Sequence, residues 1–152
     1  MSVSYSAADI IVKLLKDLSL VQDPDTSGVV TPCWINFLPD QPDVFDRAVA
    51  VNDTTGLKEG RLMIGTNILR YGVQIVVREA THRAGWTLCA AIEAALELIA
   101  GDIVYIGSSS DPSFTVHNVS QTSPILFLGL EQGSSKRRKM FTINYLVSIT
   151  ED

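Results

Sequence analysis

Residues 141–149 read Phe-Thr-Ile-Asn-Tyr-Leu-Val-Ser-Ile, and this stretch decides the fold. Every second residue is large and apolar: Phe141, Ile143, Tyr145, Val147 and Ile149. Because the side chains of a strand point alternately to its two faces, this period of two predicts a β-strand with one buried face. The strand carries no nucleophile, base and orienting residue in a recognisable order, so it predicts a structural element rather than an active site.

The segment before this strand combines a second strand-like run with a basic turn. Ile125–Leu130 is apolar, and the one run of bases in the chain, Lys136, Arg137, Arg138 and Lys139, follows a glycine-containing turn. Three interpretations of the bases are considered: a solvated flank, a salt-bridging contact with an acidic neighbour, and a phosphate contact. The solvated flank and the salt-bridging contact both remain open, and a contact with DNA phosphates is less favoured than either. We expect that reversing all four charges to glutamate disrupts assembly and leaves the monomer folded.

Composition limits the classes of protein to consider. The chain has 152 residues, of which 46% are hydrophobic and 19% charged, which predicts one domain over residues 1–152 with a substantial core. The net charge of -5 argues against a general nucleic-acid-binding surface. No signal peptide or membrane-spanning run is recognisable, so we expect synthesis in the cytoplasm and no membrane partner. Cys33 and Cys89 lack metal or redox spacing and are interpreted as small buried hydrophobes.

Two helices and several strands are predicted along the chain. Ser6 caps a helix with Ile11, Leu14, Leu15 and Leu18 on one face. A second helix begins at His82 or Arg83 and runs to Ala100, where Gly101 ends it. Its apolar stripe consists of Gly85, Leu88, Cys89, Ile92, Leu96 and Ile99. Strands are predicted at 31–38, 46–51, 71–78, 103–106, 114–119, 125–130 and 141–149.

This order of elements predicts an α+β fold with a mixed, largely antiparallel sheet and two main helices packed on one face. Residues 52–69 have weak periodicity and are predicted to form a long loop, of the kind that is usually functional or mobile.

The chemistry-bearing residues do not form a recognisable active site, so we expect no enzyme, no cofactor and no metal. Asp40, Asp43 and Asp46 are interpreted as turn acids because Pro42 interrupts helical spacing. His82 and His117 are interpreted as surface or hydrogen-bonded histidines. A ligand groove between the second helix and the loop at 52–69 remains an alternative.

Several segments, in this order along the chain, resemble a family of phage proteins. They are Trp34, Leu38–Asp43, Asn52–Gly56, Tyr71–Arg78, the alanine-rich run Ala84–Leu98, Leu128–Glu131 and Phe141–Tyr145. Together they resemble the tail terminator (minor capsid or tail completion) proteins of long-tailed bacteriophages such as lambda. The chain departs from the family's closing pattern in having Glu131 instead of Asp, a longer basic turn, and Tyr145 instead of Phe.

The resemblance implies a virion protein at the head-proximal end of the tail. Such a subunit forms a hexameric ring that caps the tail tube, halts its polymerisation and offers a docking surface to the head-completion complex. The implied partners are further copies of the chain, the major tail tube protein, the head-completion connector protein, and genomic DNA in transit through the lumen. We predict interface contacts at Lys136, Arg137, Arg138 and Lys139, together with Arg61 and Arg70. A head-completion or tail-completion adaptor ring is the first alternative, and a small ligand-binding domain or enzyme is the second.

Overall fold

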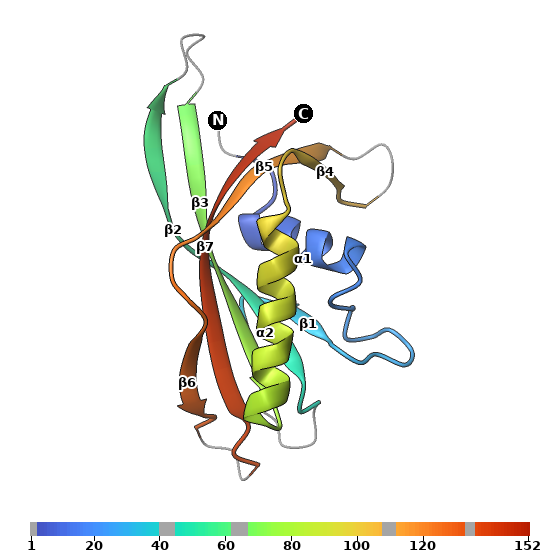
Figure 1. Ribbon diagram of the computed structural model, residues 1–152. Coiled ribbons are helices and arrows are strands. Elements are labelled where there is room, and N and C mark those ends of the chain that lie inside the picture. Colours follow the sequence, from blue (N-terminus) through green and yellow to red (C-terminus); the bar gives the residue numbers. More distant parts are fainter. Residues whose placement is uncertain (1–2, 40–44, 62–66, 108–111, 133–135) are drawn as a thin grey trace.

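A computed structural model describes residues 3–39, 45–61, 67–107, 112–132 and 136–152, with the backbone alone at 58–61, 67 and 68. It is a mixed α/β structure in which a curled sheet of seven strands carries two helices (Figure 1). The elements are α1 (Ala7–Asp17), β1 (Cys33–Ile35), β2 (Ala48–Arg61), β3 (Asn67–Glu79), α2 (His82–Glu97), β4 (Asp102–Tyr105), β5 (Ser113–Gln121), β6 (Leu126–Leu130) and β7 (Lys139–Glu151).

The strand order is β1-β2-β3-β7-β5-β4, with β6 also paired to β7. All pairs of named strands are antiparallel except β1 with β2, so the predicted mixed, largely antiparallel sheet is confirmed. The end of β7 at residues 145–151 pairs with β5, whereas its beginning at residues 139–142 pairs with β6. Two strands therefore share one side of β7, and the chain turns between them at residues 122–125.

Both helices begin where the sequence predicts. The Ser6 side chain accepts a hydrogen bond from the Asp9 amide and Asp9 bonds back to the Ser6 amide, which forms a capping box. The Thr81 side chain accepts from the Ala84 amide at the start of α2. The second helix ends at Glu97, three residues before the predicted end, although Gly101 does adopt the expected left-handed conformation with φ 87°.

One core cluster joins both helices to the sheet. The predicted stripe of α2 is buried, and Ile10, Ile11, Leu14 and Leu15 of α1 are buried as well, while Leu18 is exposed. They pack against the alternating apolar residues of β7. They also pack against the apolar residues of β3, which are Val73, Ile75 and Val77. The structure matches the expectation of two helices packed on one face of the sheet only in part, because the curled sheet of seven strands dominates the molecule.

The predicted loop at residues 52–69 is wrong in its main part. β2 extends to Arg61 and β3 begins at Asn67, so the segment continues the two central strands as a long hairpin (Figure 1). Register shifts after Thr54 and Lys58 interrupt the alternation that sequence reasoning searches for. Glycine suits this irregular pairing, since a Cβ at Gly72 would overlap the backbone of Thr55.

The first predicted strand is shorter than expected. β1 covers three residues of the predicted 31–38 and lies parallel to β2. Asn36 ends it with a φ of 59°, a left-handed conformation that a continuing strand does not use. The Asn36 side chain then bonds to Asp53, and Asp53 accepts a further hydrogen bond from the Ala8 amide at 2.9 Å. These contacts connect β1, β2 and the start of α1.

Candidate assembly surface

A buried cluster of charges lies beneath the basic turn. Arg78 of β3 and Arg138 have exposures of 0% and 1%, and both bind the carboxylate of Glu131, which follows β6. Arg138 does so with two bonds, from Nε at 2.6 Å and from Nη2 at 3.2 Å. Arg78 Nη1 donates to Glu131 Oε1 at 3.1 Å. A planar guanidinium suits this bidentate contact.

The same two arginines also hold the segment that precedes β2. Arg78 donates to the carbonyl oxygens of Pro39 and Phe45, and Arg138 donates to that of Phe45 at 3.3 Å. Asp46 lies 3.8 Å from Arg138. Burial lowers the pKa of Arg78, and the neighbouring charge of Arg138 adds to this effect, whereas Glu131 opposes it. The cluster therefore joins β3, the end of β6, the start of β7 and the segment before β2.

The burial of Arg138 changes the interpretation of the basic turn. Lys136 and Arg137 are exposed, and Lys139 is half-buried at the start of β7. Lys136 lies 3.5 Å from Asp46, and both side chains are nearly half exposed. The expectation that all four bases can be reversed without unfolding the monomer is therefore wrong for Arg138, whose charge is held inside the molecule. Lys136 and Arg137 remain the accessible part of the turn.

Arg61 and Arg70 do not join this turn. Arg70 lies opposite Ser148 on β7, whereas Lys139 lies opposite Glu79, nine residues farther along β3. At the usual rise per strand residue this separation is roughly 30 Å. The backbone of Arg61 ends β2 opposite Asn67, and its side chain lies outside the described part of the structure. The six predicted interface residues thus belong to two ends of the sheet.

An apolar edge lies beside the basic turn, on the strand that the sequence predicts at 125–130. Leu126, Phe127 and Leu128 of β6 are 42%, 47% and 58% exposed. The Phe127 ring lies 4.9 Å from that of His82 and 5.2 Å from that of Phe141, measured between centroids. The exposed Trp86 stacks near His82. Among the described residues, β6 has no strand on its side away from β7.

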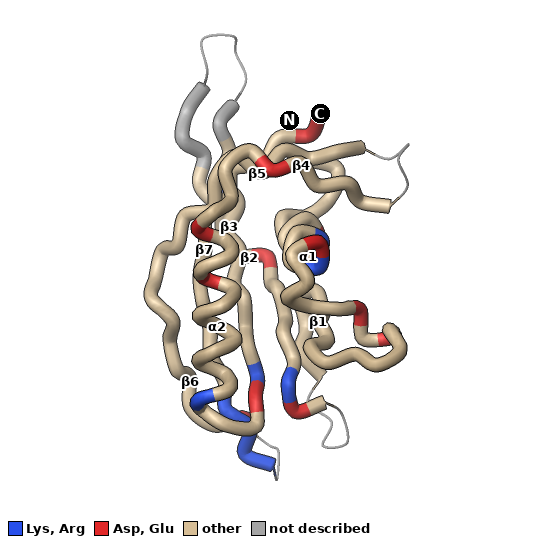
Figure 2. Tube along the Cα trace, turned by 45° about the vertical axis from the view of Figure 1, so that its right-hand side comes forward, with Lys and Arg blue, Asp and Glu red and all other residues tan. Residues whose placement is uncertain are grey.

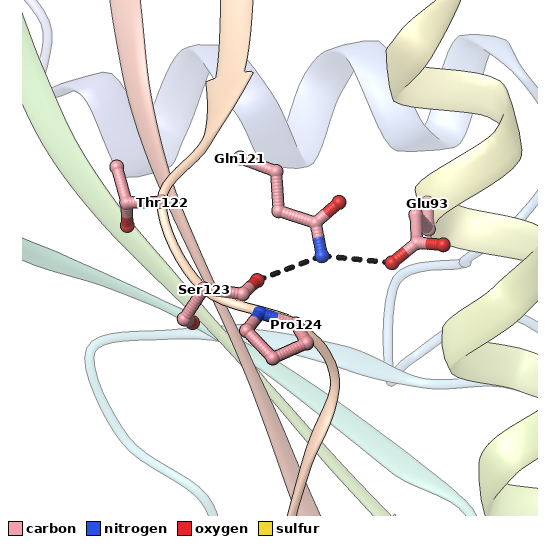
Figure 3. A pocket seen from close by; sticks show the side chains of 5 residues that line it. All are labelled: Glu93, Gln121, Thr122, Ser123 and Pro124. Atoms are coloured by element: carbon pink, nitrogen blue, oxygen red, sulfur yellow. Dashed lines mark hydrogen bonds between the residues drawn. The ribbon is translucent and has the colours of Figure 1, made fainter.

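An open depression lies between α2 and the turn that joins β5 to β6. Glu93, Gln121, Thr122, Ser123 and Pro124 line it (Figure 3). The Gln121 side-chain amide donates to Glu93 Oε2 and to the Ser123 carbonyl, each at 2.7 Å. The amide thus ties α2 to the turn. This site is not the groove expected between α2 and residues 52–69.

The histidines and acids stand as follows. His82 and His117 are exposed, and His117 Nε2 lies 2.8 Å from the Thr150 hydroxyl, which confirms the surface interpretation. Asp40 and Asp43 lie outside the described residues. Within the described part of the chain, three or more metal-binding side chains do not gather at any place. The described helices include none that is both long and apolar enough to span a membrane.

Both cysteines are buried and free, as predicted. Burial raises the pKa of each thiol to about 12, so both stay protonated and shielded at pH 8. We expect a maleimide reagent to leave the native protein unlabelled at this pH and to modify two thiols after denaturation in guanidinium chloride, as read by intact mass. Rapid labelling of the native chain would show that one of these regions opens readily.

The chain matches no protein-family model and no curated protein.

Proposed function

We propose that this chain is a structural subunit of a phage neck. It forms a ring, hexameric as the resemblance implies, that caps the tail tube, stops tube polymerisation and offers a docking surface to the head-completion complex. The observation that carries the proposal is the apolar edge of β6, which lies beside a basic turn and is unpaired within the described part of the chain. An exposed apolar edge strand invites pairing with another chain, and soluble proteins normally protect such edges. Assembly of a ring would cover it.

The overall charge agrees with this role. DNA that passes through a ring must not be retained, and a lumen rich in Lys and Arg would bind its phosphates. The net charge of -5 suits a channel that DNA crosses without sticking. The proposed partners are other copies of the chain, the tail tube protein and the head-completion connector, with DNA in transit only.

Two other classes compete with the terminator. A head-completion or tail-completion adaptor would share the size, the acidity and the open edge. A small ligand-binding domain would use the depression at Glu93 and Gln121. Addition of the purified protein to polymerising tail tube subunits separates the terminator from both alternatives. A terminator caps tubes at one end and arrests their growth, as seen by electron microscopy, whereas an adaptor or a ligand-binding domain leaves growth unchanged.

The accessible bases provide a test that leaves the buried side chains of Arg78, Glu131 and Arg138 unchanged. We expect the double variant Lys136→Glu/Arg137→Glu to fold normally and to lower tube capping at least tenfold, because both side chains are exposed beside the β6 edge. The double variant Lys13→Glu/Lys16→Glu on α1 changes the net charge by the same amount and is the matched control. Its capping should stay near that of the natural chain. Equal activity of both variants would remove the turn from the contact.

A further inference from the structure

A second apolar edge lies on the other side of the molecule from β6. Ile103 and Tyr105 of β4 are 54% and 53% exposed, and Leu98, four residues before this strand, is 82% exposed. Among the described residues, β4 pairs with β5 alone and its other side is open. Of the thirteen large hydrophobic side chains exposed in the described chain, seven belong to these two edges, if Trp86 beside β6 is included. The exposed apolar surface is therefore concentrated at two places.

The curl of the sheet points these edges in different directions. β5 and β6 both pair on the side of β7 that faces away from β3, so in a flat sheet the open edges of β4 and β6 would face the same way. The twist along β7 separates them, and β6 lies at the lower left and β4 at the upper right in both views (Figures 1 and 2). A neighbour on one edge leaves the other free.

The charges next to the two edges are opposite in sign. The exposed Arg83 lies in the first turn of α2 at the β6 end, where the basic turn also lies. Glu97 at the end of α2 and Asp102 at the start of β4 are exposed at the other end. Figure 2 shows several bases at the β6 end, with some acids among them, and acids around β4, β5 and the C-terminus. Two copies joined through unlike edges bring opposite charges together, whereas two β6 edges facing each other would bring like charges together.

We infer that the β6 edge of one copy binds the β4 edge of a second copy, an inference that rests on the proposed ring function. The two strands have similar lengths, five and four residues, so they can pair along most of their backbone groups. The contact joins two different surfaces, so a pair of copies still has one open β6 edge and one open β4 edge. Such a heterologous contact propagates head to tail until a ring closes. The apolar side chains and the unlike charges give the contact its area and its orientation.

Engineered cysteines test which edges meet. Leu128→Cys and Ile103→Cys are placed on separate chains, and their exposed positions make a loss of folding unexpected. The two proteins are mixed, with and without tail tube subunits, and treated with a short bifunctional maleimide. The buried native thiols of Cys33 and Cys89 are expected not to react with the maleimide. We expect cross-linked dimers in the mixture and none from either single variant by itself. A chain that carries both substitutions should give cross-linked oligomers of increasing size. Val30→Cys, at a position 63% exposed and remote from both strands in sequence, is the matched control and should form no dimer.

The outcomes distinguish a failure of the inferred contact between β6 and β4 from a failure of the proposed terminator function. Dimers from Leu128→Cys alone would indicate an edge that binds its own counterpart, and would overturn the inference. Capped tubes without the mixed cross-link would also overturn it, while the terminator function would stand. Mixed cross-links without capped tubes would support the contact and remove the terminator function. As an independent measurement, Leu128→Lys should abolish self-association by sedimentation with an unchanged melting temperature, whereas Val30→Lys should leave both unchanged.

Discussion

Replacement of Glu131 by glutamine is expected to lower the free energy of unfolding by about 3–5 kcal/mol. The substitution keeps the size of the side chain and removes its charge, so Arg78 and Arg138 would face each other in the interior without their shared counterion. Carbonyl oxygens of Pro39 and Phe45 solvate the guanidinium groups but carry no net charge. The remaining acid, Asp46, lies 3.8 Å from Arg138 and is 45% exposed, so water screens its charge. Chemical denaturation measured by circular dichroism gives the change directly.

An exposed acid provides the matched control. Asp17 forms an ion pair with Lys13 on α1, and its side chain is 46% exposed. We expect Asp17→Asn to cost no more than about 0.5 kcal/mol, because water and salt screen such pairs. If the two variants lost equal stability, the charges around Glu131 would behave as solvated ones, and the cluster would not be what joins the segment before β2 to the sheet.

The charge cluster could not be recognised from the sequence because it depends on three-dimensional register. Arg78 shares one side of its strand with Gln74 and Val76, opposite the apolar side, and that pattern predicts solvent exposure. It becomes buried because β3 pairs with β7 in a register that sets Arg78 opposite Met140 and places Arg138 nearby. The acid that follows β6 was visible as Glu131, but nothing local assigns it to two arginines 53 and 7 residues away.

Local signals were sufficient where local interactions determine the structure. Ser6 caps its helix as predicted, and Thr81 caps α2 at the predicted start, since a side-chain oxygen satisfies amides a few residues away. The strand at 141–149 and its buried face are confirmed by the exposures of β7. The hairpin of β2 and β3 was missed because its outer part is held by pairing between strands rather than by a regular apolar face. Open edges were likewise unpredictable, because strand order is a property of the whole sheet.

Replacement of Phe141 by alanine is expected to lower the free energy of unfolding by a similar amount, about 3–5 kcal/mol. The ring is completely buried and lies between the start of α2 and the apolar edge. It packs 5.2 Å from His82 and 5.2 Å from Phe127, and a Cβ at Gly85 would overlap it, so helix and sheet approach closely here. Removal of the ring would leave a cavity that the helix cannot fill without moving.

Two further substitutions separate this effect from the general cost of losing an aromatic ring. Phe37→Ala removes a ring that is 58% exposed and has an edge contact with Trp34, and we expect a loss within about 0.5 kcal/mol. Phe141→Leu keeps most of the buried volume and should cost roughly 1–1.5 kcal/mol. Thermal unfolding followed by circular dichroism ranks the three variants. If Phe141→Ala were no worse than Phe37→Ala, α2 would have to close the cavity by shifting toward β7, and Phe127 on the β6 edge would lose the surface that supports it.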